Sequence, residues 1–262
     1  MMYKLPKRKE LVAYRTIDFH THTGVDLRLA AESEREHIAS NIENLLKSMD
    51  DAGVDLAVTF NQPIPKGKHA EYNYELSKDV ALNGKKRIIQ FAFLNPWEEE
   101  TPSLLEQLIK DYGVKGLKLH PLFDNYPDKY NKILANETMP TFDVANAYNI
   151  PVVIHSGWGV RVESILEVAK QFPHLNVGVL HLFDNVFPCQ SYDNVFVETS
   201  YAQHPRRIRQ VVEKLGAERV FFGSDFAWSD QLLEKIKILR SQLTDDQVDK
   251  ILYKNAKELL KL

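Results

Sequence analysis

The chain has 262 residues, 44% of them hydrophobic and 26% charged, so it can bury a large core and belongs to no disordered or fibrous class. The formal net charge of −3 disfavours nucleic acid or an acidic membrane surface as a partner. Because Cys189 is the only cysteine, an internal disulfide is excluded and any metal must be held by nitrogen and oxygen ligands. With no signal peptide and no run of roughly 18 apolar residues, we expect a cytoplasmic protein.

Short β-branched or aromatic runs alternate with amphipathic stretches along the whole chain. They predict eight strands, at 15–20, 54–60, 87–94, 114–120, 150–155, 176–181, 194–199 and 219–224. Several of these runs are apolar on both faces, which is typical of a parallel sheet covered by helices. Eight such units without a dividing linker predict a (β/α)8 TIM barrel, with residues 1–262 forming a single domain.

Helix start and stop signals fill the gaps between the strands. One helix is predicted from Ser33 to residue 51, and another begins at Thr101, with a proline in its first turn. The last begins at Thr244, where Gln247 completes a capping-box spacing. Helices should end at Gly53, Gly84 and Gly113. The connection at 184–193 has room for about one short helical turn, so the sixth unit of the barrel is expected to be degenerate.

Polar side chains, mostly histidines, end the predicted strands. In a barrel of this type, the active site lies at the carboxyl ends of the strands. The strongest candidates end four different strands and are His20 and His22, His155, His181, and Asp225. Each alone has an ordinary structural explanation, such as a hydrogen-bonded histidine or a helix-capping aspartate. Their coincidence on one rim predicts a metal site.

His20 and His22 are two residues apart, so both side chains should lie on one face of the first strand, with Asp18 below them on the same face. Neutral imidazole suits zinc and other divalent transition metals, and a carboxylate can complete a ligand set without thiolates. The HxH pair therefore predicts two of the ligands.

Lys118 and His120 share a face of the fourth strand by the same argument. The lysine could be a carboxylated bridging ligand, a substrate-binding cation, or a barrel lysine paired to an acid such as Asp18. His120 could be another ligand or a substrate contact. Arg28 and Arg161, in loops after the first and fifth strands, could bind a substrate carboxylate, although solvated surface charge is the commoner role.

Four aromatic residues lie in the predicted rim loops and could form an apolar wall for a ring-bearing substrate: Phe123, Trp158, Tyr201 and Trp228. The remaining histidines are interpreted as surface or structural residues at His37, His69 and His174, and as the start of a helix at His204.

Six segments occur in a specific order along nearly the whole chain: IDFHTH, GLKLHP, IPVVIHSGWG, NVGVLHLF, ERVFFGSDF and ILYKNAKELLKL. Together they resemble the amidohydrolase superfamily, and more narrowly its amidohydrolase-related branch of hydrolases and nonoxidative decarboxylases. The resemblance implies a set of metal ligands, namely His20, His22, His155 and Asp225. It also implies that His181 is a second-metal ligand or an acid–base group.

The chain departs from the superfamily pattern in two places, which affect the expected domain organisation and the expected number of metal ions. Only 17 residues precede Asp18, so the chain resembles the bare barrel form without a flanking β-sandwich. The binuclear members with a carboxylated lysine end the fourth strand at that lysine, whereas here Lys118 is followed by His120. One ion is therefore favoured over two, with zinc as the first choice and manganese as the second.

The leading functional interpretation is metal-assisted hydrolysis of an amide, lactone or ester in a small molecule. Asp225 would orient or deprotonate the water, and His181, near its ordinary pKa of about 6.5, would donate to the oxyanion or leaving group. The alternative is nonoxidative decarboxylation of a small carboxylic acid, aromatic acids included, in which a histidine protonates the carbon. A TatD-type phosphoesterase is disfavoured. A catalytically inactive metal-binding barrel and a homodimer both remain open.

Overall fold

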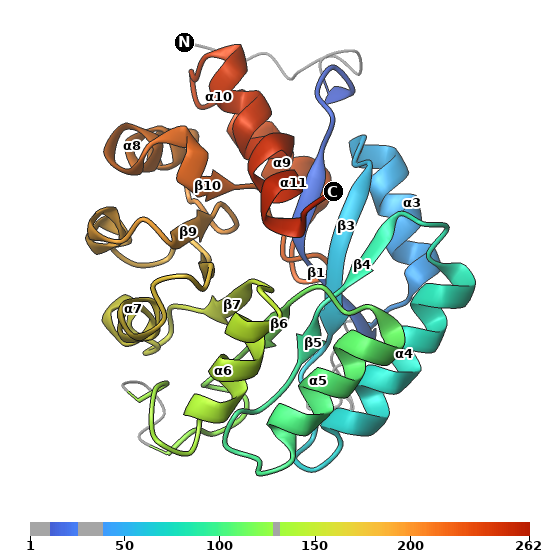
Figure 1. Cartoon of the computed structure of the whole chain (residues 1–262). Helices are drawn as coiled ribbons and strands as arrows, with labels where there is room; N and C mark the ends of the chain where they lie inside the picture. Colours follow the sequence, from blue (N-terminus) through green and yellow to red (C-terminus); the bar gives the residue numbers. More distant parts are fainter. Residues whose placement is uncertain (1–10, 26–38, 128–131) are drawn as a thin grey trace.

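The structure is a computed structural model that describes residues 11–25, 39–127 and 132–262. Its parallel strands form a ring with the helices outside it (Figure 1). In ring order they are β1 (Ile17–Val25), β3 (Leu56–Asn61), β4 (Ile88–Gln90) with its continuation β5 (Ala92–Phe93), β6 (Leu117–Leu119), β7 (Val152–His155), β8 (Val177–Leu180), β9 (Val195–Glu198) and β10 (Val220–Phe221). A two-residue strand, β2 (Ala39–Ser40), pairs antiparallel with the end of β1. The predicted (β/α)8 barrel is confirmed, and no flanking β-sandwich occurs among these residues.

The first and last strands close the ring through backbone hydrogen bonds. The Phe19 amide donates to the Phe222 carbonyl at 2.9 Å, and the Asp225 amide donates to the His20 carbonyl at 2.8 Å. The pairing of β1 with β3 shifts register between Asp18 and Thr21, which breaks the strict alternation of side chains.

The expectation that Asp18 lies below His20 and His22 on one strand face is wrong, because the register shift separates them and the Asp18 side chain contacts Ser224 and Gln231 instead of the histidine rings. Its carboxylate accepts hydrogen bonds from the Ser224 amide at 2.9 Å, from the Ser224 hydroxyl at 2.5 Å and from the Gln231 amide group at 2.7 Å. Asp18 therefore ties β1 to the segment after β10 and to the first turn of the following helix.

The helices follow the strands in the expected order. They are α3 (Ile42–Ala52), α4 (His69–Asn83), α5 (Thr101–Tyr112), α6 (Met139–Ala147), α7 (Val162–Gln171), α8 (Pro205–Leu215), α9 (Gln231–Leu239), α10 (Asp245–Asp249) and α11 (Asn255–Leu260), with a π-helical segment, η3 (Lys250–Lys254), between the last two. Short 3-10 helices follow β8, as η1 (Phe187–Ser191), and precede β10, as η2 (Ala217–Arg219). No described helix is both long and apolar enough to cross a membrane.

Several local predictions are confirmed. Helix α5 has a proline in its first turn, and the capping box at Thr244 is complete. The 3-10 helix η1 stands where a sixth α-helix would be, so the sixth unit is degenerate. The predicted helix from Ser33 is partly wrong, because residues 39–40 form β2 and α3 begins only after its cap, Asn41. Its first residues, 33–38, lie outside the described part of the chain.

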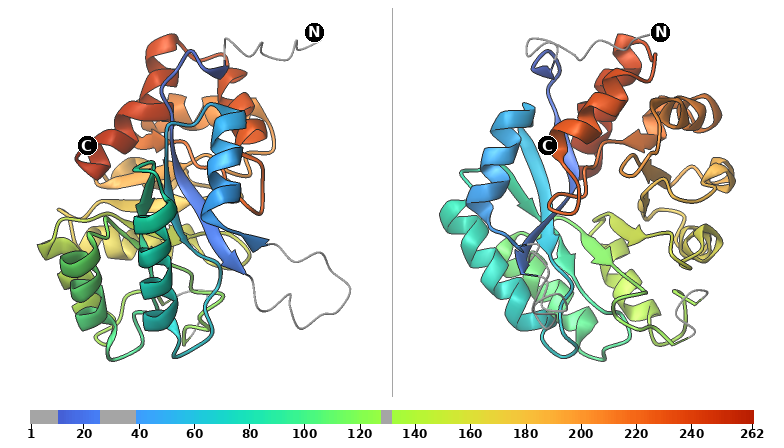
Figure 2. Two further views of the ribbon diagram at one scale, coloured as in Figure 1. Left: turned by 90° about the vertical axis from the view of Figure 1, so that its right-hand side faces the viewer. Right: turned by 180° about the vertical axis from the view of Figure 1, so that it is seen from behind.

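Aromatic side chains fill the inside of the barrel. Phe19 from β1 is fully buried there, with its ring centroid 5.4 Å from that of Phe91 and 4.7 Å from that of Phe221. The same buried cluster includes Ala256 and Leu259 of α11. The C-terminal helix therefore packs against the barrel interior. Figure 2 shows this helix and the strands from the side and from behind.

We expect Asn255→Ala to lower the free energy of unfolding by about 1–3 kcal/mol. The buried Asn255 amide donates to the Ala217 and Val220 carbonyls, at 2.7 and 2.6 Å, and so joins α11 to the last strand. Urea unfolding measures the effect. As a control, Asn83→Ala removes an exposed contact with Asp79 and should change stability by less than about 0.5 kcal/mol. Equal effects of the two substitutions would contradict the role given to Asn255.

Candidate active site

Three side-chain atoms converge where the first and last strands end. His20 Nε2 lies 3.3 Å from His22 Nε2, and Asp225 Oδ1 lies 2.9 Å from the former and 3.2 Å from the latter. All three residues are buried. The structure therefore brings the side chains of His20 and His22 together, and the closing of the ring brings Asp225 beside them.

The opposite ring nitrogens of the two histidines are already engaged. His22 Nδ1 lies 2.9 Å from the Asn61 carbonyl, which can only accept, so this nitrogen carries the proton. His20 Nδ1 faces Glu198 Oε2 at 3.2 Å. Both Nε2 atoms therefore point toward each other and toward Asp225, and each would turn a lone pair toward a cation held between them. Metal-binding histidines are oriented by hydrogen bonds of this kind, so the residues fit a divalent metal ion.

The electrostatics of the cluster favour positive charge. Burial by itself would raise the pKa of Asp225, but His20 and His22 hold it well below its ordinary value. Burial likewise lowers the pKa of His20, yet Asp225 and Glu198 raise it above its ordinary value overall. A cation between these groups would meet the same attraction.

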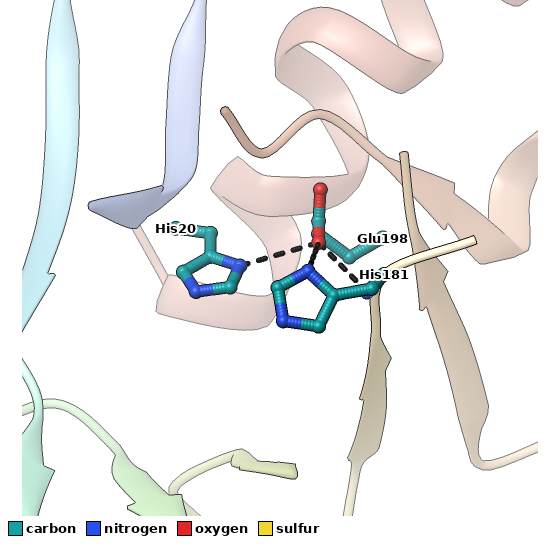
Figure 3. Close-up of side chains that lie close together, drawn as sticks. All are labelled: His20, His181 and Glu198. Carbon is teal, nitrogen blue, oxygen red and sulfur yellow. Dashed lines mark hydrogen bonds and ion pairs between the residues drawn. The ribbon is translucent and has the colours of Figure 1, made fainter. Parts of the chain in front are cut away.

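A second group of three potential ligands consists of His20, His181 and Glu198 (Figure 3). Its carboxylate already accepts hydrogen bonds from the backbone of His181, at 3.0 Å, and from both the amide and the hydroxyl of Ser200. Glu198 is fully buried. We therefore assign this carboxylate to the support of the histidines and place the candidate metal position at His20, His22 and Asp225.

A cavity of about 200 Å³ opens on the cluster. Its walls are lined by His22, Lys118, His120, Phe123, His155, Trp158, His181, Phe183, Tyr201, Asp225 and Trp228. The volume is below the usual range for drug-sized ligands, about 300–1,000 Å³, so the cavity suits a small molecule. The four aromatic residues predicted from the rim loops are all in this wall.

Two stacks of rings form one side of the pocket. His120 lies between Phe123 and His155, with centroids at 3.6 and 3.8 Å and nearly parallel planes. Trp158 lies over Phe183 at 5.3 Å. Burial holds the pKa of His120 well below its ordinary value, so this ring is neutral and serves as a flat pocket wall.

Lys118 lies inside the barrel, with its side chain fully buried. Its Nζ has no hydrogen-bond partner among the described residues and lies 5.0 Å from the centre of the Phe60 ring. Burial lowers the pKa of this amine to about 7. The suggested pairing with Asp18 is wrong, because that carboxylate is engaged by Ser224 and Gln231. Lys118 instead presents its amine to the pocket.

His181 and His155 form a hydrogen-bonded pair, with Nε2 of the former 3.0 Å from Nδ1 of the latter. Burial holds the pKa of each well below its ordinary value. The expectation that His181 titrates near 6.5 is therefore not met. His155 belongs to neither group of converging atoms, but its Nε2 is buried in the pocket without a hydrogen-bond partner.

Other predicted site residues lie elsewhere. Arg161 stands at the N-cap position of α7 without a side-chain capping bond, is exposed and does not line the pocket. His204 caps α8 through its own Nδ1. His69 is structural but not on the surface, because it is buried between Glu98 and Asp124. Arg28 and His37 lie outside the described residues.

The sequence reasoning missed Glu198, Ser200 and Phe183. Glu198 had a detectable signal, because a glutamate within a strand expected to be buried is rare unless it is paired. The other two had none, since serine and phenylalanine are common in loops.

A barrel with histidines and an aspartate gathered at its strand ends is the arrangement expected of an amidohydrolase. Residues 17–262 match the family model described as Amidohydrolase (Amidohydro_2), so the chain belongs to this amidohydrolase family. No curated protein sequence matches it.

Solved structures share the fold at low sequence identity. A 2,6-dihydroxybenzoate decarboxylase complexed with 2,6-dihydroxybenzoate is 15% identical, with a TM-score of 0.77 over 95% of this chain and 100% of that one. A 5-carboxyvanillate decarboxylase from Novosphingobium aromaticivorans is 14% identical, with a TM-score of 0.74 over 100% of both chains. A 4-oxalomesaconate hydratase from Rhodopseudomonas palustris is 19% identical, with a TM-score of 0.73 over 94% of this chain and 95% of that one.

Proposed function

We propose that this protein is a metal-dependent decarboxylase of small carboxylic acids, with aromatic acids as the first class to test. The observation that carries the proposal is the pocket itself, in which a small aromatic-walled cavity contains both a divalent-metal donor set and the unpaired amine of Lys118. Such a cavity fits a planar acid whose carboxylate meets positive charge. The similar 2,6-dihydroxybenzoate and 5-carboxyvanillate decarboxylases support this choice.

His20, His22 and Asp225 would hold the metal, with His155 Nε2 available as a fourth ligand. The ion would supply a positive charge that orients the acid and stabilises negative charge developed during the reaction. The 5-carboxyvanillate decarboxylase structure contains manganese. Manganese is therefore the first ion to test, ahead of the zinc favoured by sequence.

The chain's own residues would perform the remaining steps. The Lys118 amine would attract the substrate carboxylate, and the stacked rings of His120 and Phe123 would hold the substrate flat. Breaking the bond to the carboxyl carbon releases carbon dioxide and leaves an electron pair on the ring carbon, which needs a proton. His181 is the proposed donor. It is neutral in the pocket, and a bound anion would raise its pKa and favour its protonated form.

Hydrolysis, the leading interpretation from sequence, receives support only at the level of the family. The pocket walls are mainly aromatic and the similar structures include decarboxylases and a hydratase, so decarboxylation is the better supported alternative.

A paired substrate screen tests the proposal. Manganese-loaded protein would be incubated with hydroxybenzoates and related acids, and separately with esters, lactones and amides of similar size. We expect loss of the acid, with equimolar carbon dioxide, in the first panel only, and loss of that turnover on chelation. Turnover confined to the second panel would instead establish hydrolysis and refute the proposal.

A further inference from the structure

A second cavity, the rear cavity, lies beside the active-site pocket on the same rim of the barrel. It has a volume of about 410 Å³ and is lined by residues that follow β3, β5 and β6 in the chain, among them His69, Asn95 and Asp124. Phe123 is the one described residue that lines both the rear cavity and the active-site pocket. The ring of Phe123 therefore stands between the two spaces.

The position of Phe123 is fixed from both sides. Its ring stacks on His120, with centroids 3.6 Å apart and an angle of 17° between the planes. The backbone amides of Phe123 and Asp124 both donate to the His120 carbonyl, each at 3.1 Å. On the side of the rear cavity, Asp124 Oδ1 lies 3.5 Å from Nε2 of the buried His69. The ring of Phe123 therefore forms a fixed wall.

The active-site pocket has room for one aromatic ring in front of this wall. A cavity of about 150 Å³ is enough to hold benzene, and the pocket measures about 200 Å³. A ring with a carboxylate uses most of that space, so a second fused ring would press against Phe123. Overfilling a well-packed site forces its side chains out of their preferred positions and is unfavourable.

The rear cavity offers the space that a second ring would need. Pro63 and Ile64 give it an apolar surface, and Asn95 and Asp124 give it a polar one. Because Phe123 closes the way into it from the pocket, only removal of this ring would let a longer substrate use both spaces.

We propose that Phe123 is a specificity-determining residue, which restricts the substrate to a single-ring acid by closing the active-site pocket off from the rear cavity. The proposal rests on the decarboxylase function proposed above and defines the substrate class of the same site. Acids with two fused rings are then poor ligands of the wild-type protein and good ligands of a variant without the wall.

Isothermal titration calorimetry of manganese-loaded protein tests the proposal with benzoate and 2-naphthoate. Wild type should bind 2-naphthoate more than about 10-fold more weakly than benzoate. In Phe123→Ala the affinity for 2-naphthoate should rise by about 10-fold or more, because the second ring enters the rear cavity. The affinity for benzoate should fall by about 2–10-fold, because the ligand loses an aromatic partner. General damage to the site would weaken both ligands.

Two further variants and one structure complete the test. Phe187→Ala is the matched control, because this half-buried phenylalanine of η1 lines neither the pocket nor the rear cavity. It should leave both affinities within about twofold of wild type. Phe123→Leu removes less of the wall and should show a smaller change in the same directions. A crystal structure of Phe123→Ala with 2-naphthoate should show the second ring against Asn95 and Asp124.

The proposal is overturned if wild type binds the two acids equally well, if the Phe123 variants weaken both, or if the second ring lies outside the rear cavity. Should Phe123→Ala fail to fold, Phe123→Leu decides by the same directions. If wild type binds neither acid, the proposed function is refuted, and phenol and 2-naphthol then test the wall in metal-free protein because they need no carboxylate site. The same preference and the same reversal are expected for that pair, and their absence would refute the role of Phe123.

Discussion

Asp225→Asn is expected to reduce both manganese affinity and decarboxylase turnover by more than about 100-fold. Loss of a residue that only supports a metal ligand already reduces affinity or activity by about 10–100-fold, and loss of a ligand itself should cost more. Asp225 Oδ1 is the anionic member of the three converging atoms, at 2.9 and 3.2 Å from the two histidine nitrogens. Asparagine has nearly the same shape but no charge, and its amide group could donate toward the histidines. The change therefore removes the charge that balances the cation while leaving the pocket walls in place.

Asp184→Asn is the matched control for this substitution. Asp184 is an exposed aspartate in the loop after β8, outside the pocket lining. Metal content by elemental analysis and turnover should both remain at wild-type levels in this variant. Full manganese occupancy in purified Asp225→Asn would contradict the proposed ligand set, even if turnover were lost.

Lys118→Met is expected to stabilise the protein and to abolish its turnover. The buried amine has no hydrogen-bond partner among the described residues, and burial lowers its pKa from 10.5 to about 7. A methionine of similar size removes the buried polar group and should raise the free energy of unfolding by a few kcal/mol near neutral pH, an order-of-magnitude expectation. Opposite signs on stability and activity are typical of a residue kept for function.

The stabilisation should depend on pH in a defined direction. Between pH 7 and 10.5 the folded protein binds fewer protons at Lys118 than the unfolded chain does. The free-energy cost of burying a charged Lys118 is therefore absent above pH 10.5, grows as the pH falls, and is complete below about pH 7. Urea unfolding of metal-free protein should show the largest advantage of Lys118→Met below pH 7 and a smaller one near pH 10.

Lys235→Met provides the comparison. This lysine is also buried, but its amine donates to the Ala52 and Gly53 carbonyls at 3.2 and 2.6 Å, and it lies outside the pocket. Its replacement should leave turnover intact and lower stability, because two carbonyls lose a donor. A destabilised Lys118→Met protein, or one with normal turnover, would contradict the role given to Lys118.

Much of the fold was predictable because each strand and helix carries its own local signal. The eight apolar runs, the proline at the start of α5 and the capping box at Thr244 are read from adjacent residues. The register shift after Asp18 was not predictable, because it arises from pairing with β3, which is distant in sequence. For the same reason the short strand β2 was missed.

The candidate site was predictable to the extent that the barrel brings strand ends together. That rule placed His20, His22 and Asp225 in one cluster and the rim aromatic residues in one pocket. Hydrogen-bond partners such as Glu198 and the Asn61 carbonyl could not be assigned, because they depend on the rotation of each ring. Burial lowers the pKa of His181 well below the value of about 6.5 that the sequence analysis assumed. This effect could not be predicted from the sequence, because it depends on the side chains that surround the ring.

The most direct test of the proposed function uses the best acid from the substrate screen, isotopically labelled at its carboxyl carbon. Labelled carbon dioxide would be measured with the manganese-loaded protein, after chelation, and after manganese is restored. We predict one labelled carbon dioxide for each acid consumed, its loss on chelation and its return on reloading. Consumption of the acid without labelled carbon dioxide, or release that persists in metal-free protein, would contradict a metal-dependent decarboxylase.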